Sequence, residues 1–290
     1  MRYVAPTTVD EARSLLAEHP GSQVFAGATD LVPQIRAGRP APLVLVDLKR
    51  IDRLMTVTHE DGQWRIGAAT PASDLTRNSD FTAMFPGLSE GMGLIGSDQI
   101  QNRSSLGGNL VNASPAADSV PSMIANAVQA VIATGDGTRT VPVAEIATGP
   151  GRTSLADGEF IIEFTVADPP AGTSDAYLRM IPRTEMDIAI VGSAVRLTVD
   201  GDIVTDANVV LGAVAPTAVT VPDAVAALIG ATINAGLIDD SVMNTLADAA
   251  SAACNPIDDK RGTVTYRRQV AGVLTRRAAA IAAGRAQNGA

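Results

Sequence analysis

The chain has 290 residues, of which 46% are hydrophobic, and it carries a formal net charge of −9 at pH 7. This length is sufficient for two or three modest domains rather than one small core. The negative charge argues against nucleic acid or an anionic membrane as a partner, and an aromatic content of 3% argues against a stacking platform for single-stranded nucleic acid.

Side chains that carry chemistry are few. Cys254 is the single cysteine, and His19 and His59 lie far apart in the sequence, so we expect no internal disulfide, no iron–sulfur cluster and no metal site in this chain. No Ser/His/Asp or Cys/His set is visible, and we predict no catalytic residues. The N-terminus lacks the apolar core of a signal peptide, and no apolar run is long enough to span a bilayer, which favours a cytoplasmic location.

The first 50 residues alternate between strand and helix patterns. The pair Thr8 and Glu11 forms a capping-box signature before an apolar stripe. The expected elements are a helix from Thr8 to about Pro20, a strand at 24–25, a helix over 31–37 that Gly38 stops, and a strand over 43–47. This rhythm predicts a small parallel unit.

The next segment, to about residue 170, mixes hairpins with helices. Asp61-Gly62 and Gly135-Asp136-Gly137 are turn signals between apolar runs, and they predict two hairpins. The expected elements are strands over 56–60, 63–67, 130–134, 139–143 and 160–166, and helices over about 71–77, 81–92 and 120–127. Pro169-Pro170-Ala171-Gly172 is stiff and rich in turn residues, and it predicts a domain boundary.

Beyond this boundary we expect two strands, then an alanine-rich helical region. The strands cover 189–199 and 203–211 and join at Asp200-Gly201-Asp202. The last helix is expected over about 266–283, with a frayed tail after Gly284. The arginines at 267–268 and 276–277 are the one concentrated positive feature, which fits either pairing with local carboxylates or contact with a partner subunit.

The segment 99–118 is the most informative stretch of the chain. Gly107 and Gly108 are followed by Asn109, Asn112, Ser114 and Asp118 and then by an apolar helix. Glycines let backbone N–H groups approach a bulky anion, and short polar side chains bind a sugar or a diphosphate. Asp118 fits two roles equally well, an N-cap of the following helix or an acceptor for a ribose or ribityl hydroxyl.

A second small-residue loop, Ala26-Gly27-Ala28-Thr29-Asp30, follows a strand and opens a helix, where N–H groups attract phosphate. Taken alone, it also fits an ordinary turn in which Thr29 or Asp30 caps the helix. Two such loops in one chain favour a dinucleotide ligand. The segment 91–96 matches the pattern G-x-G-x-x-G but follows a helix, so we interpret it as a helix exit whose Leu94 and Ile95 wall the pocket.

These motifs resemble those of the medium, FAD-binding subunits of the molybdenum hydroxylases, the family that includes carbon monoxide dehydrogenase and bacterial xanthine dehydrogenases. Residues 26–30 match the family's A-G-G-x-[DS] loop, and residues 100–118 match I-x-N-x-x-[TS]-[ILV]-G-G-N-x-x-x-x-S-P-x-x-D. The segment from Asp258 to Arg268 is similar to the C-terminal signature R-G-x-x-x-Y-R-R. The likeness extends over essentially the whole chain.

The resemblance implies an α+β fold, with a two-lobed FAD-binding part of the vanillyl-alcohol-oxidase (PCMH) type and a C-terminal α+β domain with a small antiparallel sheet. The implied divisions are 1–55, 56–170 and 171–290. The implied cofactor-binding residues, together with those singled out above, are Ala26, Gly27, Ala28, Thr29, Asp30, Ile95, Ser105, Gly107, Gly108, Asn109, Asn112, Asp118, Ile162 and Arg179.

Two residues depart from the family pattern. Ala28 stands where a second glycine is usual, which implies an ordinary backbone φ at that position. Arg179 and Met180 differ from the more basic stretch of several relatives.

The implied function is that of an FAD subunit in a complex. Electrons from a molybdenum cofactor in a large subunit would pass through [2Fe–2S] clusters of a small subunit to FAD in this chain and then to an external acceptor. The complex is expected to be a dimer of heterotrimers. The alternatives are a stand-alone flavin oxidoreductase of the same fold with its own substrate, and a non-catalytic nucleotide-binding assembly subunit.

Overall fold

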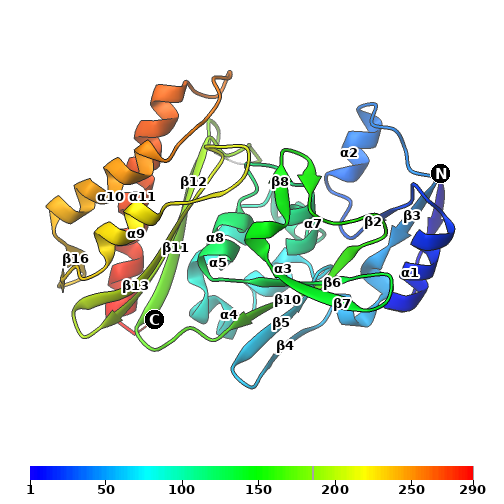
Figure 1. Cartoon of the computed structure of the whole chain (residues 1–290), viewed down its shortest axis with the longest axis horizontal. Helices are drawn as coiled ribbons and strands as arrows, with labels where there is room; N and C mark the ends of the chain where they lie inside the picture. Colours follow the sequence, from blue (N-terminus) through cyan, green and yellow to red (C-terminus); the bar gives the residue numbers. More distant parts are fainter. Residues whose placement is uncertain (185, 290) are drawn as a thin grey trace.

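Three sheets carry the architecture, and a computed structural model describes it for residues 1–184 and 186–289. In these residues a three-stranded, a five-stranded and a four-stranded sheet follow one another along the chain. In Figure 1 the first sheet lies at one end of the molecule, the third with its helices at the other, and a cluster of helices in between. The α+β fold expected from the sequence is confirmed.

The N-terminal unit is the parallel sheet that the sequence predicts, with strand order β1-β3-β2. Thr8 and Glu11 form both hydrogen bonds of the capping box at the start of its first helix. Its elements are β1 (Arg2–Val4), α1 (Val9–Glu18), β2 (Gln23–Phe25), α2 (Leu31–Arg36) and β3 (Val44–Asp47), followed by the 3-10 helices η1 (Leu48–Arg50) and η2 (Asp52–Leu54).

The five-stranded sheet has the order β4-β5-β10-β6-β7, in which both predicted hairpins are confirmed and β10 joins them. Its apolar core packs against short helices and includes Trp64, Phe81, Phe85, Leu88 and Phe164. The strands are β4 (Val57–Glu60), β5 (Gln63–Gly67), β6 (Gln129–Ala133), β7 (Thr138–Pro142) and β10 (Phe160–Ala167); the helices are α3 (Ala72–Thr76), α4 (Ser79–Met84), α5 (Pro86–Gly93), α6 (Asp98–Gln101), α7 (Leu106–Val111) and α8 (Ser119–Ala125); η3 (Val143–Glu145), β8 (Ala147–Gly149) and β9 (Arg152–Thr153) complete the unit.

The single helix expected over 81–92 is wrong, because the chain forms two helices there. Phe85 leaves the helical region with φ −130° and ψ 61°, and Pro86 begins α5. Proline lacks an N–H and disfavours helical geometry in the residue before it, so α4 ends where α5 begins. The sequence pattern showed the apolar period but not this break.

The C-terminal sheet is antiparallel, in the order β11-β12-β13-β14, and its apolar core is built largely from alanine and valine. α11 packs on β11 and β12 and against α10. At Gly272 an added Cβ would lie 2.8 Å from the Ala247 carbonyl oxygen, so small residues let the two helices approach. The elements are β11 (Thr173–Met180), β12 (Val191–Asp200), β13 (Ile203–Gly212), β14 (Val219–Thr220), α9 (Pro222–Leu228), β15 (Ile233–Asn234), β16 (Leu237–Ile238), α10 (Asp240–Ala252) and α11 (Val264–Gln287).

Two sequence expectations in this unit are wrong. Strand β11 was not predicted, and α11 continues past Gly284 instead of fraying there. Gln287 explains the longer helix, because its side chain accepts a hydrogen bond from the Gly236 N–H and donates one to the Ile233 carbonyl. Across the described residues, every helix is either too short or too polar to cross a membrane.

Candidate functional site

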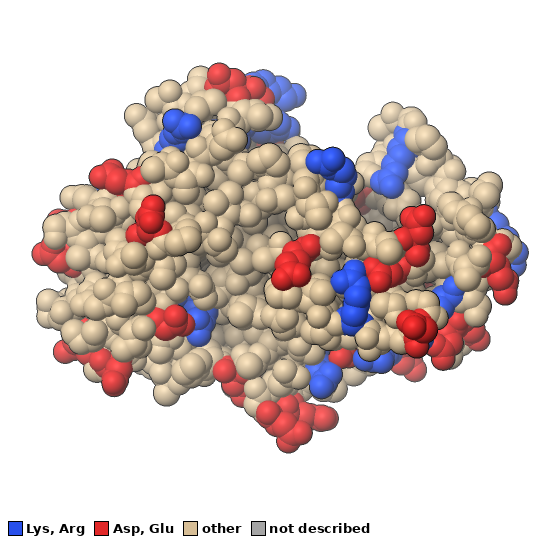
Figure 2. Space-filling view, in the orientation of Figure 1, with Lys and Arg blue, Asp and Glu red and all other residues tan. Residues whose placement is uncertain are grey.

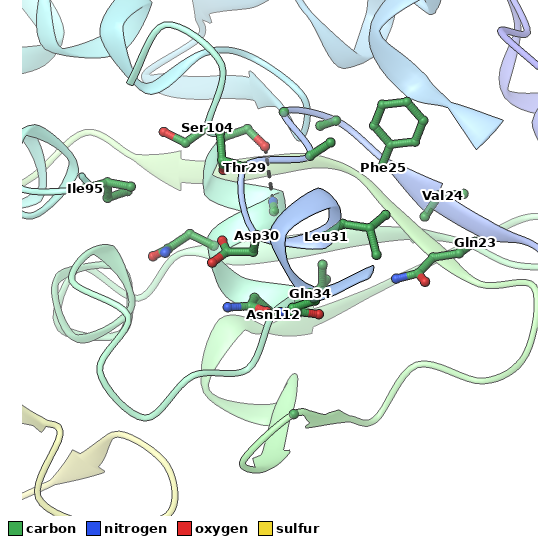
Figure 3. Close-up of a pocket in the computed structure, with 18 of the residues that line it drawn as sticks. Gln23, Val24, Phe25, Thr29, Asp30, Leu31, Gln34, Ile95, Ser104 and Asn112 are labelled. Atoms are coloured by element: carbon green, nitrogen blue, oxygen red, sulfur yellow. Dashed lines mark hydrogen bonds between the residues drawn. The ribbon is translucent and has the colours of Figure 1, made fainter. Parts of the chain in front are cut away.

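A cavity of about 210 Å³ opens where the two predicted loops come together. The loop between β2 and α2 forms one wall, and the start of α7 forms the other. Figure 3 shows Ile95 at the opposite side of this pocket from Val24 and Phe25. The predicted site residues that line it are Ala26, Gly27, Ala28, Thr29, Asp30, Ile95, Ser105, Gly108, Asn109 and Asn112.

The two loops touch at Gly27. A Cβ added there would lie 2.1 Å from the Arg103 carbonyl oxygen, so any side chain would force the loops apart. The Arg103 Nε donates a hydrogen bond to the Gly27 carbonyl at 3.3 Å. Gly27 is therefore required for the close approach of the two backbones that form the pocket.

Ala28 contradicts the expectation of an ordinary backbone conformation. Its φ is +59°, in the left-handed region that favours glycine, although the residue carries a methyl group. The sequence departs from the family's glycine here, while the backbone keeps the geometry that glycine would suit.

The loop that lines the pocket carries backbone donors without a protein partner. Within residues 1–184 and 186–289, the N–H groups of residues 27–30 donate to no protein acceptor. The alternative that Asp30 caps α2 is wrong, because its side chain makes no capping hydrogen bond. Burial raises the pKa of the Asp30 carboxyl above its ordinary value.

Gly107 and Gly108 have different surroundings. The Gly107 N–H donates to the Ala68 carbonyl at 3.2 Å, and an added Cβ would lie 2.5 Å from the same oxygen. The Gly108 N–H donates to the Ser105 hydroxyl, which caps α7, and an added Cβ would meet only that hydroxyl, at 3.3 Å. Both N–H groups are thus engaged within the protein. The contribution of Gly108 to the pocket is the space left by its missing side chain.

Asn109 and Asn112 form hydrogen bonds that connect the elements around the pocket. Asn112 accepts a hydrogen bond from the Gln34 side chain at 2.9 Å, which ties α7 to α2. Asn109 accepts one from the Ser119 hydroxyl at 2.7 Å, which ties α7 to α8.

Figure 2 shows a hollow between α2 and the centre of the molecule, on a face where basic side chains are scattered among acidic ones.

Asp118 does not cap α8. Its backbone is helical, with φ −65°, and its side chain makes no capping hydrogen bond, so that alternative is wrong. The carboxylate instead binds the Arg179 guanidinium at 2.6 Å and the Tyr177 hydroxyl at 2.9 Å. Burial raises the pKa of Asp118 to about 6, although Arg179 and Tyr177 act in the opposite direction.

The Asp118–Arg179 pair lies next to the pocket wall. Arg179 also donates to the Leu94 carbonyl at 2.8 Å, and the next residue, Ile95, lines the pocket. Tyr177 and Arg179 both come from β11, the strand that sequence analysis missed. The signal that was available is the alternation of Asp175, Tyr177 and Arg179 along one face of a strand.

A second cavity, of about 400 Å³, shares Gly108 and β2 with the first. Its walls include Gly107, Phe160 and Ile161. Ile162, the aliphatic residue named from the family pattern, is fully buried in the core beside β3 instead. Its neighbours Phe160 and Ile161 are the residues of β10 that line this cavity.

The described residues around the two cavities offer hydrogen-bond donors and open space for a ligand. In the part of the chain that the structure describes, no group of three or more His, Cys, Asp or Glu side chains could hold a metal ion. Cys254 is buried, and its burial raises the pKa of the thiol to about 11, so it is not an active nucleophile. The site combines N–H groups that have no protein acceptor, space beside Gly108 where no side chain protrudes, and an adjoining apolar cavity. These features suit a large ligand with an anionic centre.

Two family models match nearly the whole chain. Residues 1–169 match the family described as "FAD binding domain in molybdopterin dehydrogenase", and residues 176–282 match "CO dehydrogenase flavoprotein C-terminal domain". The chain is 31% identical over 277 residues to the carbon monoxide dehydrogenase medium chain of Hydrogenophaga pseudoflava, covering 95% of this chain and 94% of that one.

Two further comparisons extend the likeness. The chain is 28% identical over 291 residues to the xanthine dehydrogenase FAD-binding subunit of Escherichia coli O157:H7, covering 98% of each. It superimposes with a TM-score of 0.92, at 32% identity and 98% coverage of each chain, on a chain of the H. pseudoflava carbon monoxide dehydrogenase that lacks the Mo-pyranopterin moiety of the molybdenum cofactor.

Proposed function

Because this chain belongs to the FAD-binding medium subunits of the molybdenum hydroxylase family, which are oxidoreductase subunits, we propose that it relays electrons within a heterotrimeric complex. Electrons from a molybdenum cofactor in a large subunit reach it through [2Fe–2S] clusters of a small subunit and leave to an external acceptor. Bound FAD supplies the capacity to exchange electrons both in pairs and singly. The complex is a dimer of heterotrimers in the cytoplasm.

One observation carries this proposal: backbone N–H groups without a protein acceptor lie in a loop that lines a cavity. The N–H groups of residues 27–30 bind the diphosphate, and Gly108 admits it. The adjoining cavity walled by Phe160 and Ile161 accepts the adenine end. Ile95 and the Asp118–Arg179 pair bound the flavin end. Residues 1–55 and 56–170 are the two lobes that form this site, and 171–290 is the third domain.

Co-purification tests the proposal. The complex purified from its native host is expected to contain this chain with two partner subunits, together with molybdenum, iron and flavin, measured by metal analysis and absorption. If the chain arrives alone with flavin and without iron, the complex is refuted and the stand-alone flavin oxidoreductase replaces it. If the chain arrives without flavin, the site assignment is refuted as well.

The absence of a catalytic set favours the subunit over the stand-alone enzyme. Among the described residues that line the pocket, Asp30 is the titratable side chain besides Arg39, and it lies in the loop assigned to the diphosphate. Acid–base catalysis in a self-contained oxidase would use a titratable side chain that faces the substrate, whereas Asp118, at the flavin end, is buried and paired with Arg179. The chain is therefore best explained as a relay whose substrate chemistry takes place in another subunit.

A further inference from the structure

Strand β11 holds α5 at three points along its length. Asp175, Tyr177 and Arg179 are alternate residues of β11 and so share one face of the strand. They meet the beginning, the middle and the end of α5 in turn. Figure 1 shows α5 beside β11 in the middle of the molecule, and helix and strand run in the same direction.

The beginning of α5 is held by a buried carboxylate. Asp175 accepts hydrogen bonds from the Gly87 and Leu88 N–H groups at 2.8 and 3.1 Å, which satisfies two donors of the first helical turn. Asn126 donates to the same carboxylate at 2.7 Å. At Gly87 an added Cβ would lie 2.7 Å from the Ala176 backbone, so helix and strand are in close contact there.

The middle of α5 is held by Glu90. Its carboxylate accepts a hydrogen bond from the Tyr177 N–H at 2.8 Å and pairs with Arg285 of α11. Arg285 also donates to the Asp175 carbonyl at 2.8 Å. β11 is the edge strand of its sheet, and these contacts satisfy the outward N–H of Tyr177 and the outward carbonyl of Asp175.

The end of α5 leads directly into the pocket. Arg179 donates to the Leu94 carbonyl, and Ile95 lines the cavity between the two loops. On its other side α5 packs closely on α8, since a Cβ at Gly91 would lie 2.8 Å from the Asp118 carbonyl. A shift of α5 along β11 would therefore move both Ile95 and Asp118.

We propose that Glu90 and Asp175 are positioning residues for the flavin cofactor, acting through α5 to hold Leu94 and Ile95 at the pocket. This inference rests on the proposed function. It assigns to the C-terminal sheet a part in cofactor binding that goes beyond stabilising its own domain. Neither carboxylate lines the cavity, so each acts through the helix it holds.

Glu90→Ala is the first test, because the Glu90 side chain is one-third exposed and its loss leaves the core packed. We expect it to weaken FAD binding by the full chain about tenfold, a loss of roughly 1.4 kcal/mol in binding free energy, and to shift the flavin reduction potential. Asp175→Asn, which removes the charge but keeps the size, is expected to act in the same direction. Glu90→Gln is expected to restore affinity, since its amide oxygen still accepts from Tyr177.

Asn78→Ala is the matched control. Asn78 caps the neighbouring helix α4 by accepting from the Phe81 N–H at 3.0 Å, so its removal costs a comparable bond without touching α5. It is expected to lower the melting temperature while leaving FAD affinity and potential unchanged. Glu90→Ala with wild-type affinity and potential, or Asn78→Ala with an equal loss of affinity, overturns the inference. Failure of the wild-type chain to bind FAD refutes the proposed function instead, and the inference with it.

Discussion

At the scale of single residues, Gly107 and Gly108 are required for different reasons: Gly108 leaves space for the ligand, and Gly107 leaves space for the backbone of Ala68. Gly108→Val is expected to weaken FAD binding about 100-fold, near 3 kcal/mol, because its side chain fills the approach to the pocket. The fold should survive, since the added Cβ would come within 3.3 Å of the Ser105 hydroxyl alone, a side-chain group that can shift by rotation. Fluorescence titration of the apo chain with FAD measures the affinity.

Gly107→Val supplies the contrast. Its Cβ would collide with the Ala68 carbonyl, so we expect a loss of several kcal/mol in the free energy of unfolding and poor recovery of folded protein. Wild-type FAD affinity in Gly108→Val would refute the assignment of the diphosphate to this approach.

Ala28 allows a stabilising substitution. Because its φ is +59°, Ala28→Gly is expected to raise the free energy of unfolding by about 1 kcal/mol, which thermal melting of the apo chain detects. Ala37→Gly, at an ordinary φ of −82°, is the control and should lose stability. A loss at both positions would show that residue 28 is unstrained.

At the scale of elements, Asp175 gives the α5–β11 contact a pH dependence. Burial raises the pKa of its carboxyl from 3.8 to about 6, the neighbouring Glu90 adds to the rise, and the hydrogen bonds from Gly87, Leu88 and Asn126 oppose it. Between pH 3.8 and about pH 6, the Asp175 carboxyl is protonated in the folded chain and ionised in the unfolded chain. The contribution of Asp175 to stability is therefore present below pH 4 and falls as the pH rises through about 6.

Asp175→Asn removes this titration. We expect the difference in unfolding free energy between the wild-type chain and Asp175→Asn to shift by roughly 1 kcal/mol in favour of the wild type when the pH is lowered from about 7.5 to about 5. Urea unfolding of both apo proteins at the two pH values measures it. Parallel pH curves for the two proteins would contradict the raised pKa.

Elements with strong local signals were predictable from the sequence, and those fixed by distant contacts were not. The capping box of α1 and the turns at Asp61-Gly62 and Gly135-Asp136-Gly137 are local, and each predicted element formed. β11 was missed because one of its faces carries Asp175, Tyr177 and Arg179, whose polar groups bond to α5 and to Asp118, residues that are distant in the sequence.

The candidate site follows the same division. Its two loops were recognisable as motifs, and the structure brings them together. The partners of Asp118, Tyr177 and Arg179, lie 59 and 61 positions further along the chain, and no local pattern reports them. The positive φ of Ala28 likewise has no local signal, because alanine ordinarily avoids that conformation. Ile161 and Ile162 point to opposite faces of β10. An error of one residue in the sequence match is therefore enough to exchange the residue that faces the cavity for the one in the core.

At the scale of the whole molecule, the C-terminal sheet and the cofactor-binding part share a buried junction. Tyr177, Ala194 and Val210 of the sheet form an apolar cluster with Ala125 of α8, and Leu94 packs against it. Hydrogen bonds of Asp175, Glu90 and Arg179 join the same sheet to α5. We therefore expect the apo chain to unfold as one cooperative unit.

The single tryptophan makes this testable. Trp64 is buried in β5, within the core of the five-stranded sheet, so its fluorescence reports that part of the chain, whereas far-ultraviolet circular dichroism reports all of it. Urea unfolding curves from the two signals are expected to coincide. A fluorescence midpoint that differs from the dichroism midpoint would show that the two parts unfold independently.

The strand order of the five-stranded sheet has a consequence for synthesis of the chain. β10 lies at the centre of this sheet, between the β4–β5 and β6–β7 hairpins, yet it is the last of the five strands to leave the ribosome. Until Ala167 emerges, the two hairpins lack their common neighbour, and the apolar helices between them have no complete sheet to cover. Closure of this sheet is a long-range event, so we expect it to be slow and to leave apolar surface exposed in the nascent chain until β10 is in place.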